Sequence, residues 1–519
     1  MDIGSGKSFL TRRQVLAGMS AAAVIPLASR GMAAAVKPTG ICRFGVSGAA
    51  TTDTLDASNA RDAFPYLVNT GLRNSLTEVG RDGKLIPELA ESWEPNQDAT
   101  QWTFKIRQGV QFHSGKKLTS EDVVETFKDQ IRADSTATQR AVLADVVELK
   151  TDGPQTVIIK LKSSNVGLPD ILSHVNFAIA PFKDGKVDWT SGDGTGGYQL
   201  EEFSPGVMAK LKRNQNYWKA DRAHFEAVEI VGINDPTARL NALRAGQVDV
   251  ASRVPPKLAK MTSALTDVRV VTVNGTLHYN YCMNTALAPF SDVNVRLAMK
   301  HLINRENFVK TILGGYGSVA DDNPIAPSAK YYNADLKNPH TYDPDKAKFY
   351  LNKAGVSGLH AQLFTSDAAF DGASDGATLF SNDAKAGGVQ LDTVRTPSDG
   401  YWSDTWGKKA FFAEYWSGRS TEDSLLTQAY SKSSSENASH WVNERFNQLL
   451  VQARGELNED RRRDQYAELQ QILHDDSGSI VVAFVDHVMA VTPKLEIGQL
   501  APTGYELENF RAIERWSFK

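Results

Sequence analysis

Alternating and helical patterns of apolar residues divide this chain into short strands and helices that follow one another in no regular order. Residues 41–46, 277–284 and 480–485 have the alternating or continuous apolar character of strands. Residues 443–457 and 461–474 repeat apolar residues at the spacing of an amphipathic helix. An irregular succession of this kind predicts mixed α/β lobes rather than a barrel or a repeat.

The most specific run of local signals lies in residues 76–128. It predicts a strand and turn, a short helix at residues 87–92, a strand at residues 102–106 and a hairpin. A longer helix is then expected, because Thr119 and Asp122 stand at the spacing of a capping box and apolar residues follow at helical intervals.

Three further helices are expected from the residues at their ends. Asp292 and Asp343 each precede an apolar-periodic segment and are expected to be N-caps. Gly355 ends the helix that follows Asp343, and Gly246 ends a helix that begins within residues 235–240, as glycine commonly does.

Length and charge narrow the class of protein. A chain of 519 residues exceeds what one hydrophobic core normally organises, so two or more lobes are expected. The formal net charge of −4 argues against a nucleic-acid partner, which calls for a basic face. The two cysteines, Cys42 and Cys282, exclude a disulfide-dense scaffold; they are either one bridge or two unpaired buried thiols.

The first 35 residues have the order of parts expected of an export signal. Arg12 and Arg13 resemble a twin-arginine motif, an apolar stretch follows, and Ala35 ends a small-residue cleavage site. The apolar stretch is too short to span a bilayer, and no lipobox-like triplet precedes Cys42. We therefore expect a soluble, non-lipidated periplasmic protein without direct membrane insertion.

Residues 76–128, with the later helix and strand blocks in the same order, resemble the cluster C (family 5) extracellular solute-binding proteins of ABC importers. The resemblance implies an α/β, two-lobed type II periplasmic binding fold with mixed sheets, a hinge and an interlobe ligand cleft. It implies a signal peptide at residues 1–35, lobe I at 36–281 with an extra subdomain, lobe II at 282–484, and a return to lobe I at 485–519. A monomer that delivers a small or peptide-like ligand to an inner-membrane permease is expected.

Residues 401–419 are the richest candidate for gripping a ligand. Aromatic residues Tyr401, Tyr415 and Trp416 precede Gly418 and Arg419, and residues 411–416 are expected to be a buried strand. In peptide-binding relatives a Trp-x-x-Asp motif holds the ligand's amino group, and here Arg419 replaces that aspartate. Arginine favours a carboxylate or phosphate instead, so opines, sugar-phosphate conjugates and modified peptides become candidates. The alternative is that Arg419 pairs with a neighbouring acidic residue on the same turn.

Three further residues are secondary candidates for ligand contact. Thr52 lies in a segment that resembles the family's cleft-facing loop, and Asp367 and Phe370 follow an expected strand of lobe II. Asp367 either receives a cationic group or caps the next helix.

The sequence offers no support for an enzyme. No zinc-protease helix or nucleophile elbow occurs, and the ten histidines are scattered along the chain. We expect neither a cofactor nor a metal site. The remaining alternatives are an ordinary dipeptide or oligopeptide receptor, a nickel or haem carrier, and a receptor that also serves chemotaxis.

Overall fold

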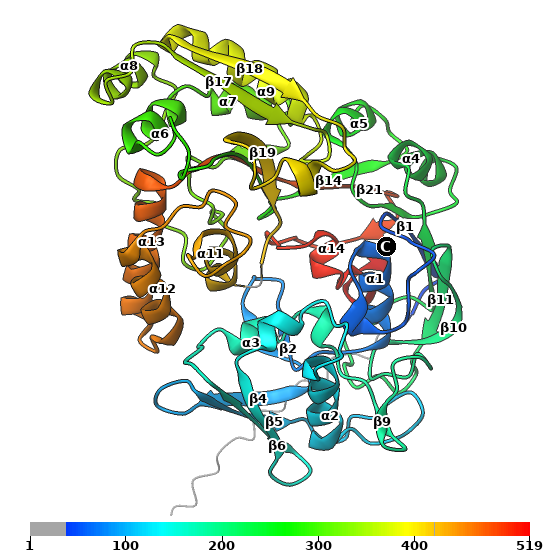
Figure 1. The fold of residues 1–519 in the computed structure, drawn as a ribbon. Helices are drawn as coiled ribbons and strands as arrows, with labels where there is room; N and C mark the ends of the chain where they lie inside the picture. The colour runs from blue at the N-terminus through cyan, green and yellow to red at the C-terminus, as the bar shows by residue number, and fades with distance from the viewer. Residues whose placement is uncertain (1–37, 420) are drawn as a thin grey trace, which may run out of the picture.

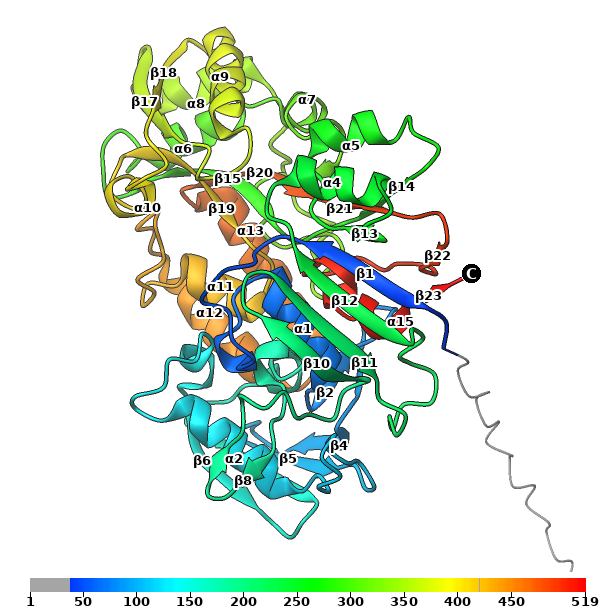
Figure 2. The same cartoon turned by 90° about the vertical axis from the view of Figure 1, so that its right-hand side faces the viewer.

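The computed structural model describes residues 38–419 and 421–519, and these form two lobes joined by two chain crossings (Figures 1 and 2). Lobe I is built around a seven-stranded sheet and lobe II around a six-stranded sheet. A smaller four-stranded sheet lies beyond lobe I, at the bottom of Figure 1. The expected export signal lies outside the described residues.

The seven-stranded sheet of lobe I mixes parallel and antiparallel pairs. Its strands in spatial order are β10 (Tyr198–Ser204), β11 (Met208–Arg213), β12 (Ala227–Gly232), β1 (Ile41–Val46), β13 (Val250–Ala251), β21 (His487–Val491) and β14 (Arg269–Val273). β1 is parallel to both of its neighbours, and the remaining pairs are antiparallel. A strand from the C-terminal region therefore lies inside a sheet begun at the other end of the chain.

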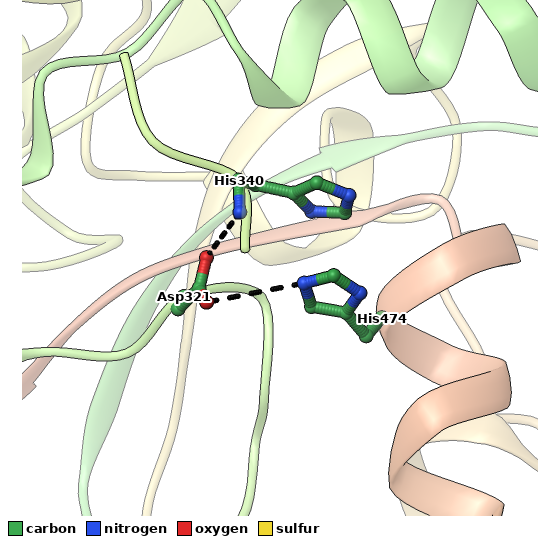
Figure 3. Close-up of side chains that lie close together, drawn as sticks. All are labelled: Asp321, His340 and His474. Atoms are coloured by element: carbon green, nitrogen blue, oxygen red, sulfur yellow. Dashed lines mark hydrogen bonds and ion pairs between the residues drawn. The ribbon is translucent and has the colours of Figure 1, made fainter. Parts of the chain in front are cut away.

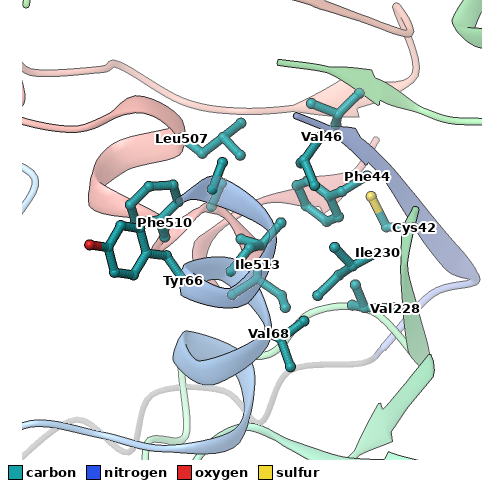
Figure 4. Close-up of a cluster of buried hydrophobic side chains, with 14 of the residues drawn as sticks. Cys42, Phe44, Val46, Tyr66, Val68, Val228, Ile230, Leu507, Phe510 and Ile513 are labelled. Atoms are coloured by element: carbon teal, nitrogen blue, oxygen red, sulfur yellow. The ribbon is translucent and has the colours of Figure 1, made fainter. Parts of the chain in front are cut away.

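The core of lobe I lies between this sheet, helix α1 (Ala63–Leu72) and the C-terminal segment (Figure 4). Phe44 of β1 packs on Trp516, with ring centroids 6.3 Å apart. Leu507 and Ile513 are completely buried in the same cluster. Burial of large apolar side chains stabilises a fold by about 1.5–3 kcal/mol each, so the C-terminal segment is part of the core rather than an appendage.

The region of the four-stranded sheet contains strands where the sequence predicted a short helix, and it contains the predicted capping box at the start of α2 (Ser120–Ile131). The sheet order is β4 (Ala90–Pro95), β5 (Gln101–Ile106), β7 (Thr156–Leu161) and β6 (Val146–Thr151). The helix expected at residues 87–92 is wrong, because β3 (Leu85–Pro87) pairs with β2 (Thr77–Val79) and β4 pairs with β5. The capping box is confirmed: the Asp122 carboxylate accepts hydrogen bonds from the Thr119 amide at 3.0 Å and hydroxyl at 3.1 Å.

Lobe II surrounds a sheet whose middle strand is entirely buried. Its order is β16 (Gly317–Val319), β20 (Ser479–Val485), β15 (His278–Met283), β19 (Phe411–Trp416), β17 (Leu359–Thr365) and β18 (Val389–Arg395). All six residues of β15 are buried. The strands expected at residues 411–416 and 480–485 are confirmed.

The remaining helices lie around the two large sheets. They are α3 (Leu168–Ile171), α4 (Pro236–Arg244), α5 (Pro256–Thr262), α6 (Val293–Lys300), α7 (Arg305–Thr311), α8 (Pro344–Lys353), α9 (Ala373–Ala384), α10 (Tyr401–Asp404), α11 (Glu422–Tyr430), α12 (Glu444–Gly455), α13 (Glu459–Asp476), α14 (Glu506–Asn509) and α15 (Ala512–Arg515). Short 3₁₀ turns are Ala57–Asn59, Arg140–Leu143, Val175–Phe177 and Lys385–Gly387, and two small hairpins pair β8 (Phe182–Lys183) with β9 (Lys186–Val187) and β22 (Leu495–Glu496) with β23 (Ser517–Phe518). The two expected aspartate N-caps are confirmed, since Asp292 and Asp343 each accept a backbone N–H in the first turn. Asp235 does the same at the start of α4.

Two short segments carry the chain between the large sheets. Residues 274–277 connect β14 of lobe I to β15 of lobe II, and Asp486 connects β20 of lobe II to β21 of lobe I. Both cysteines are free and buried, and they belong to different sheets: Cys42 lies in β1 and Cys282 in β15. Of the two alternatives for the cysteines, the structure therefore has the unpaired thiols.

Candidate functional site

Two adjoining cavities lie between the lobes. They enclose about 770 Å³ and about 980 Å³, within the usual range for small-molecule sites of about 300–1,000 Å³. Residues from both lobes line both cavities, among them His174 and Tyr505 of lobe I and Gly418 and Arg419 of lobe II. Arg419 therefore lies at the junction of the two cavities.

The turn after β19 places Arg419 in this position. β19 ends at Trp416, and a side chain on Gly418 would overlap the Thr276 hydroxyl, so only glycine fits beside the chain crossing. The guanidinium donates from Nε to the Gln428 side-chain oxygen at 2.6 Å and from Nη1 to the Ser417 hydroxyl at 2.7 Å. It also stacks over the Trp416 ring at 5.7 Å. These contacts hold the arginine in one orientation with neutral partners only.

Five other arginines line the cavities; Arg61 is exposed and has no ion pair with a described residue, and the other four each face a carboxylate. Arg253 lies 2.7 Å from Asp62, Arg454 3.0 Å from Asp423, Arg462 2.6 Å from Glu459 and Arg511 2.7 Å from Glu88. Among the residues that the structure describes, no carboxylate lies within 4 Å of the Arg419 guanidinium. Glu422 and Asp423, the neighbours that the sequence suggested as partners, instead bond to the Tyr331 amide at 3.0 Å and to Arg454. The positive charge of Arg419 is thus uncompensated within this part of the chain.

A neutral histidine lies beside Arg419. The Asn176 amide donates to His174 Nδ1 at 3.2 Å, so the ring proton is on Nε2. Burial, reinforced by the positive charge of Arg419, lowers the pKa of His174 to about 4. His174 therefore presents an N–H donor to the cavities at neutral pH, and its ring packs edge-on against Tyr505 at 5.1 Å.

A strained turn of lobe I also contributes to the cavity linings, through Asn509 and Phe510. Leu507, Glu508, Asn509 and Phe510 all have positive φ values, from 53° to 65°, and none is glycine. Each costs roughly 1–2 kcal/mol relative to ordinary backbone. Arg515 lies 3.1 Å from Glu508, and the Trp516 indole donates to Glu508 at 2.6 Å, so buried polar contacts hold the turn in place.

Some of the ligand-contact residues proposed from the sequence line the cavities, and others do not. Tyr415 lines the larger cavity, and Gly418 and Arg419 line both. Trp416 is buried behind Arg419, and Phe370 is buried while stacking on Tyr279 of the larger cavity at 4.1 Å. The remaining candidates are outside both linings: Thr52 and Asp367 are exposed, and Tyr401 is buried with its hydroxyl donating to the Ala413 carbonyl at 2.6 Å.

Sequence reasoning missed His174, Tyr505 and Asp170, which all line the smaller cavity. His174 was one of ten scattered histidines, and Tyr505 stands near the C-terminus in a segment with no binding motif. Only the fold, which brings all three to a cavity that Arg419 also lines, distinguishes them.

Two groups of the described residues have spacings that suit a metal ion, and both lie in networks of internal bonds. In lobe II, His474 Nε2 lies 3.9 Å from the Asp321 carboxylate, and the His340 and His474 rings stack at 3.8 Å (Figure 3). His340 Nδ1 is already 2.7 Å from Asp322, and His474 Nδ1 is 2.9 Å from Asp475. The first bond lies within the loop after β16 and the second within α13.

The other group, in lobe I, consists of Glu78, Glu88 and Glu514. The Lys219 ammonium lies 2.5 Å from Glu78 and 2.7 Å from Glu88, and Arg511 and Arg515 supply further positive charge to the group. Protein cations thus fill the position that a metal ion would take.

Comparison with known proteins identifies the family. The model of the bacterial extracellular solute-binding proteins, family 5 (middle region), matches residues 84–438, which is more than half of the chain. The chain belongs to this family, whose members are receptors of ABC importers. The resemblance found in the sequence and the two-lobed fold class are therefore confirmed.

Individual relatives differ in what they bind. Heme-binding protein A of Haemophilus influenzae is 26% identical over 83% of this chain and 85% of its own length. Glutathione-binding protein GsiB of Salmonella typhi is 27% identical over 60% of this chain and 62% of its own length, so that match spans less than two thirds of the relative.

Solved structures share the fold. HbpA2 from Haemophilus parasuis has a TM-score of 0.80 at 22% identity, covering 93% of this chain and 100% of the other. AgaA from A. tumefaciens R10, in complex with agropinic acid, has a TM-score of 0.74 at 23% identity, covering 92% and 99%. Among the described residues, no helix is long and apolar enough to cross a membrane.

Proposed function

We propose that this protein is a periplasmic receptor that captures an anionic solute in its interlobe cleft and delivers it to an ABC permease without catalysing a reaction. The observation that carries the proposal is the uncompensated charge of Arg419, which lines both cavities between neutral partners. A carboxylate or phosphate would complete its hydrogen bonding in a bidentate pair. The Nε2 proton of His174 supplies a second donor to the same anion.

The class of solute follows from charge and size together. The cavities have room for more than an inorganic anion, and Tyr505 and Tyr415 offer aromatic surfaces to an organic body. An opine, a sugar-phosphate conjugate or a modified acidic peptide fits these requirements. The agropinic acid bound by AgaA, a protein of the same fold, is consistent with this class.

Cleft closure would occur about the two chain crossings at residues 274–277 and 486. We place lobe II between these crossings and lobe I on either side of them, which keeps the whole of β15 in the sheet with which it pairs. A ligand that contacts both lobes then shifts the population toward the closed form.

The export route is a separate part of the proposal. Residues 1–35 carry the twin-arginine pair, the apolar stretch and the small-residue cleavage site, and relatives include a nickel-binding periplasmic protein. We therefore place the mature protein, beginning at Val36, in the periplasm as a soluble monomer.

A thermal-shift screen of the protein from Val36 to Lys519 tests the anionic assignment. It compares opines, sugar phosphates and acidic conjugates with matched neutral compounds, ordinary dipeptides, hemin and Ni²⁺. A ligand at about one hundred times its dissociation constant adds about 2.7 kcal/mol of stability, which is readily detected. We expect stabilisation by members of the anionic set.

Substitution of Arg419 then identifies the anchor. Loss of a charge-assisted pair worth about 1.5–3 kcal/mol predicts that Arg419→Gln weakens the anionic ligand by about tenfold to a hundredfold. Arg395→Gln is the matched control, because Arg395 is an exposed arginine of lobe II outside both cavity linings. Unchanged affinity in Arg419→Gln would contradict the proposal, and stabilisation by hemin or Ni²⁺ alone would favour the carrier alternative.

A further inference from the structure

A carboxylate in the smaller cavity also lacks a partner. Asp170, in α3 of lobe I, lines this cavity. Within residues 38–419 and 421–519, no other residue donates a hydrogen bond to its carboxylate, and no cation lies within 4 Å. The nearby cations Lys330 and Arg462 are both bound to Glu459, at 3.2 Å and 2.6 Å. Asp170 is thus a negative counterpart of Arg419 in the same cavity.

A second carboxylate from the other lobe lies close to Asp170. Glu422, the first residue of α11, accepts one hydrogen bond, from the Tyr331 amide, and forms no ion pair with a described residue. Burial raises the pKa of Asp170 to about 6 against the opposing positive charges of Lys330 and Arg462, and the negative charge of Glu422 adds to the rise. Burial also raises the pKa of Glu422. Both cations form their ion pairs with Glu459, and their charges do not cancel the effect of burial on either carboxylate.

The neighbouring Asp423 is a carboxylate of the same cavity whose charge is compensated by an arginine. Its two oxygens lie 3.0 Å and 3.1 Å from the Arg454 Nε, and Arg454 also donates to the Thr427 hydroxyl at 2.7 Å. Asp423 and Asp170 therefore differ in pairing while lining the same cavity.

Asp170 and Glu422 lie where the two lobes touch. The Val166 amide of lobe I donates to the Arg454 carbonyl of lobe II at 2.9 Å, and a Cβ on Gly167 would lie 3.2 Å from the Thr421 methyl group. Closing the lobes brings the two carboxylates together, and like charges in a dry cavity repel. A cation between them would replace this repulsion with two attractions, one from each lobe.

We infer that the solute carries a cationic nitrogen, an ammonium or a guanidinium, which Asp170 and Glu422 hold between the lobes while Arg419 holds the anionic group. The solute is then zwitterionic, with its anion at Arg419 and its cation at α3 and α11. This inference rests on the proposed function for the role of Arg419. It narrows the solute class to conjugates that keep a free amine or guanidine, and it disfavours simple sugar phosphates and other purely anionic compounds.

A ligand-free measurement tests the unpaired state of Asp170. The melting temperature of Asp170→Asn is compared with that of Asp423→Asn, an identical change in the same cavity. We expect Asp170→Asn to leave the melting temperature unchanged or raise it, because the change removes an uncompensated charge. We expect Asp423→Asn to lower the melting temperature, because the change leaves the Arg454 guanidinium without its carboxylate partner. An equal loss in both variants would overturn the inference, because Asp170 would then be structurally paired.

Matched probe pairs test the ligand chemistry. Nα-acetylarginine is compared with Nα-acetylcitrulline, which replaces the only cationic group, the guanidinium, with a neutral urea, and glutathione with N-acetylglutathione, which lacks the ammonium. Titration calorimetry should show the zwitterionic member of a pair binding about tenfold to a hundredfold more tightly. Asp170→Asn or Glu422→Gln should remove that difference, whereas Arg419→Gln should weaken both members alike.

The outcomes separate the inference from the function on which it rests. Equal binding of the two members of a pair would overturn the cation site and leave the anionic receptor standing. If no anionic compound binds in either this comparison or the wider screen, the proposed function fails. The melting temperature of Asp170→Asn then decides whether the carboxylate is free.

Discussion

At the scale of single residues, pairing distinguishes the charges that maintain this fold from those available to a ligand. Arg305 belongs to the first kind: its Nη2 donates to the Asp322 carboxylate at 2.7 Å, and both side chains are buried in lobe II. Although burial acts in the other direction, Arg305 and the His340 contact lower the pKa of Asp322 below its usual value. Arg419 differs because its partners are all neutral.

The buried pair makes a stability prediction. Asp322→Asn should lower the free energy of unfolding by about 3 kcal/mol, because it leaves the Arg305 guanidinium buried without an opposite charge. Asparagine suits this position, since Asp322 has a φ of 57°. Urea unfolding measures the loss, and Asp392→Asn, which alters an exposed contact with His360, is the control with a change within about 0.5 kcal/mol. A similar loss in both variants would contradict the assignment of a stabilising pair.

At the scale of elements, the end of β19 determines where the cavity arginine lies. Gly418 fits against both Thr276 of one chain crossing and the Gly504 carbonyl of lobe I. Gly418→Ala should therefore cost about 1–3 kcal/mol by overpacking.

A second substitution tests the cause of that cost. The Thr276 hydroxyl is buried without a hydrogen-bond partner among the described residues, so Thr276→Ala removes the colliding atom at little expense. We expect the double variant Thr276→Ala/Gly418→Ala to regain most of the lost stability in chemical unfolding. If the double variant is as unstable as Gly418→Ala alone, the collision is not the cause.

Elements that depend on local signals were predictable from the sequence, and those that depend on distant partners were not. The capping box at Thr119 and the buried strand at residues 411–416 could be predicted because the residues that determine them are neighbours in the sequence. The segment at residues 87–92 was predicted as a helix because nothing local indicates its pairing with β2 and β5. The candidate site divides in the same way: Arg419 follows a recognisable strand, whereas Asp170 comes near Glu422 only because the start of α3 approaches the start of α11.

At the scale of the whole molecule, buried neutral histidines predict sensitivity to acid. Burial lowers the pKa of His278 to about 4, and its ring packs against Phe484 with no exposed surface. A histidine in an unfolded chain has a pKa of about 6.5. Below that pH the histidine is protonated in the unfolded chain while the buried His278 of the folded chain stays neutral, which favours unfolding. Stability should therefore fall as the pH drops from about 6.5 to about 4, by about 3 kcal/mol for a fully buried group of this kind.

Unfolding measured from pH 7.5 down to about pH 4.5 checks this expectation within the range where histidine titrates. The raised pKa of Asp170 acts in the opposite direction over the same range and offsets part of the slope. His278→Gln should flatten the pH dependence whatever it does to stability at neutral pH. A slope that is the same in His278→Gln would assign the acid sensitivity to other groups.

The position of β21 inside the first sheet has a consequence for biosynthesis. Lobe I needs β21 between β13 and β14, and it needs Leu507, Ile513 and Trp516 to fill its core. While the ribosome is still translating lobe II, the early strands of lobe I lack these partners, and their apolar residues remain exposed to solvent. Lobe I can close only after residue 516 has emerged, whereas lobe II, which is continuous in the chain and has its own core, is complete earlier. A nascent-chain holdase that covers β1 and α1 during this delay would raise the yield of folded protein more than one that acts on lobe II.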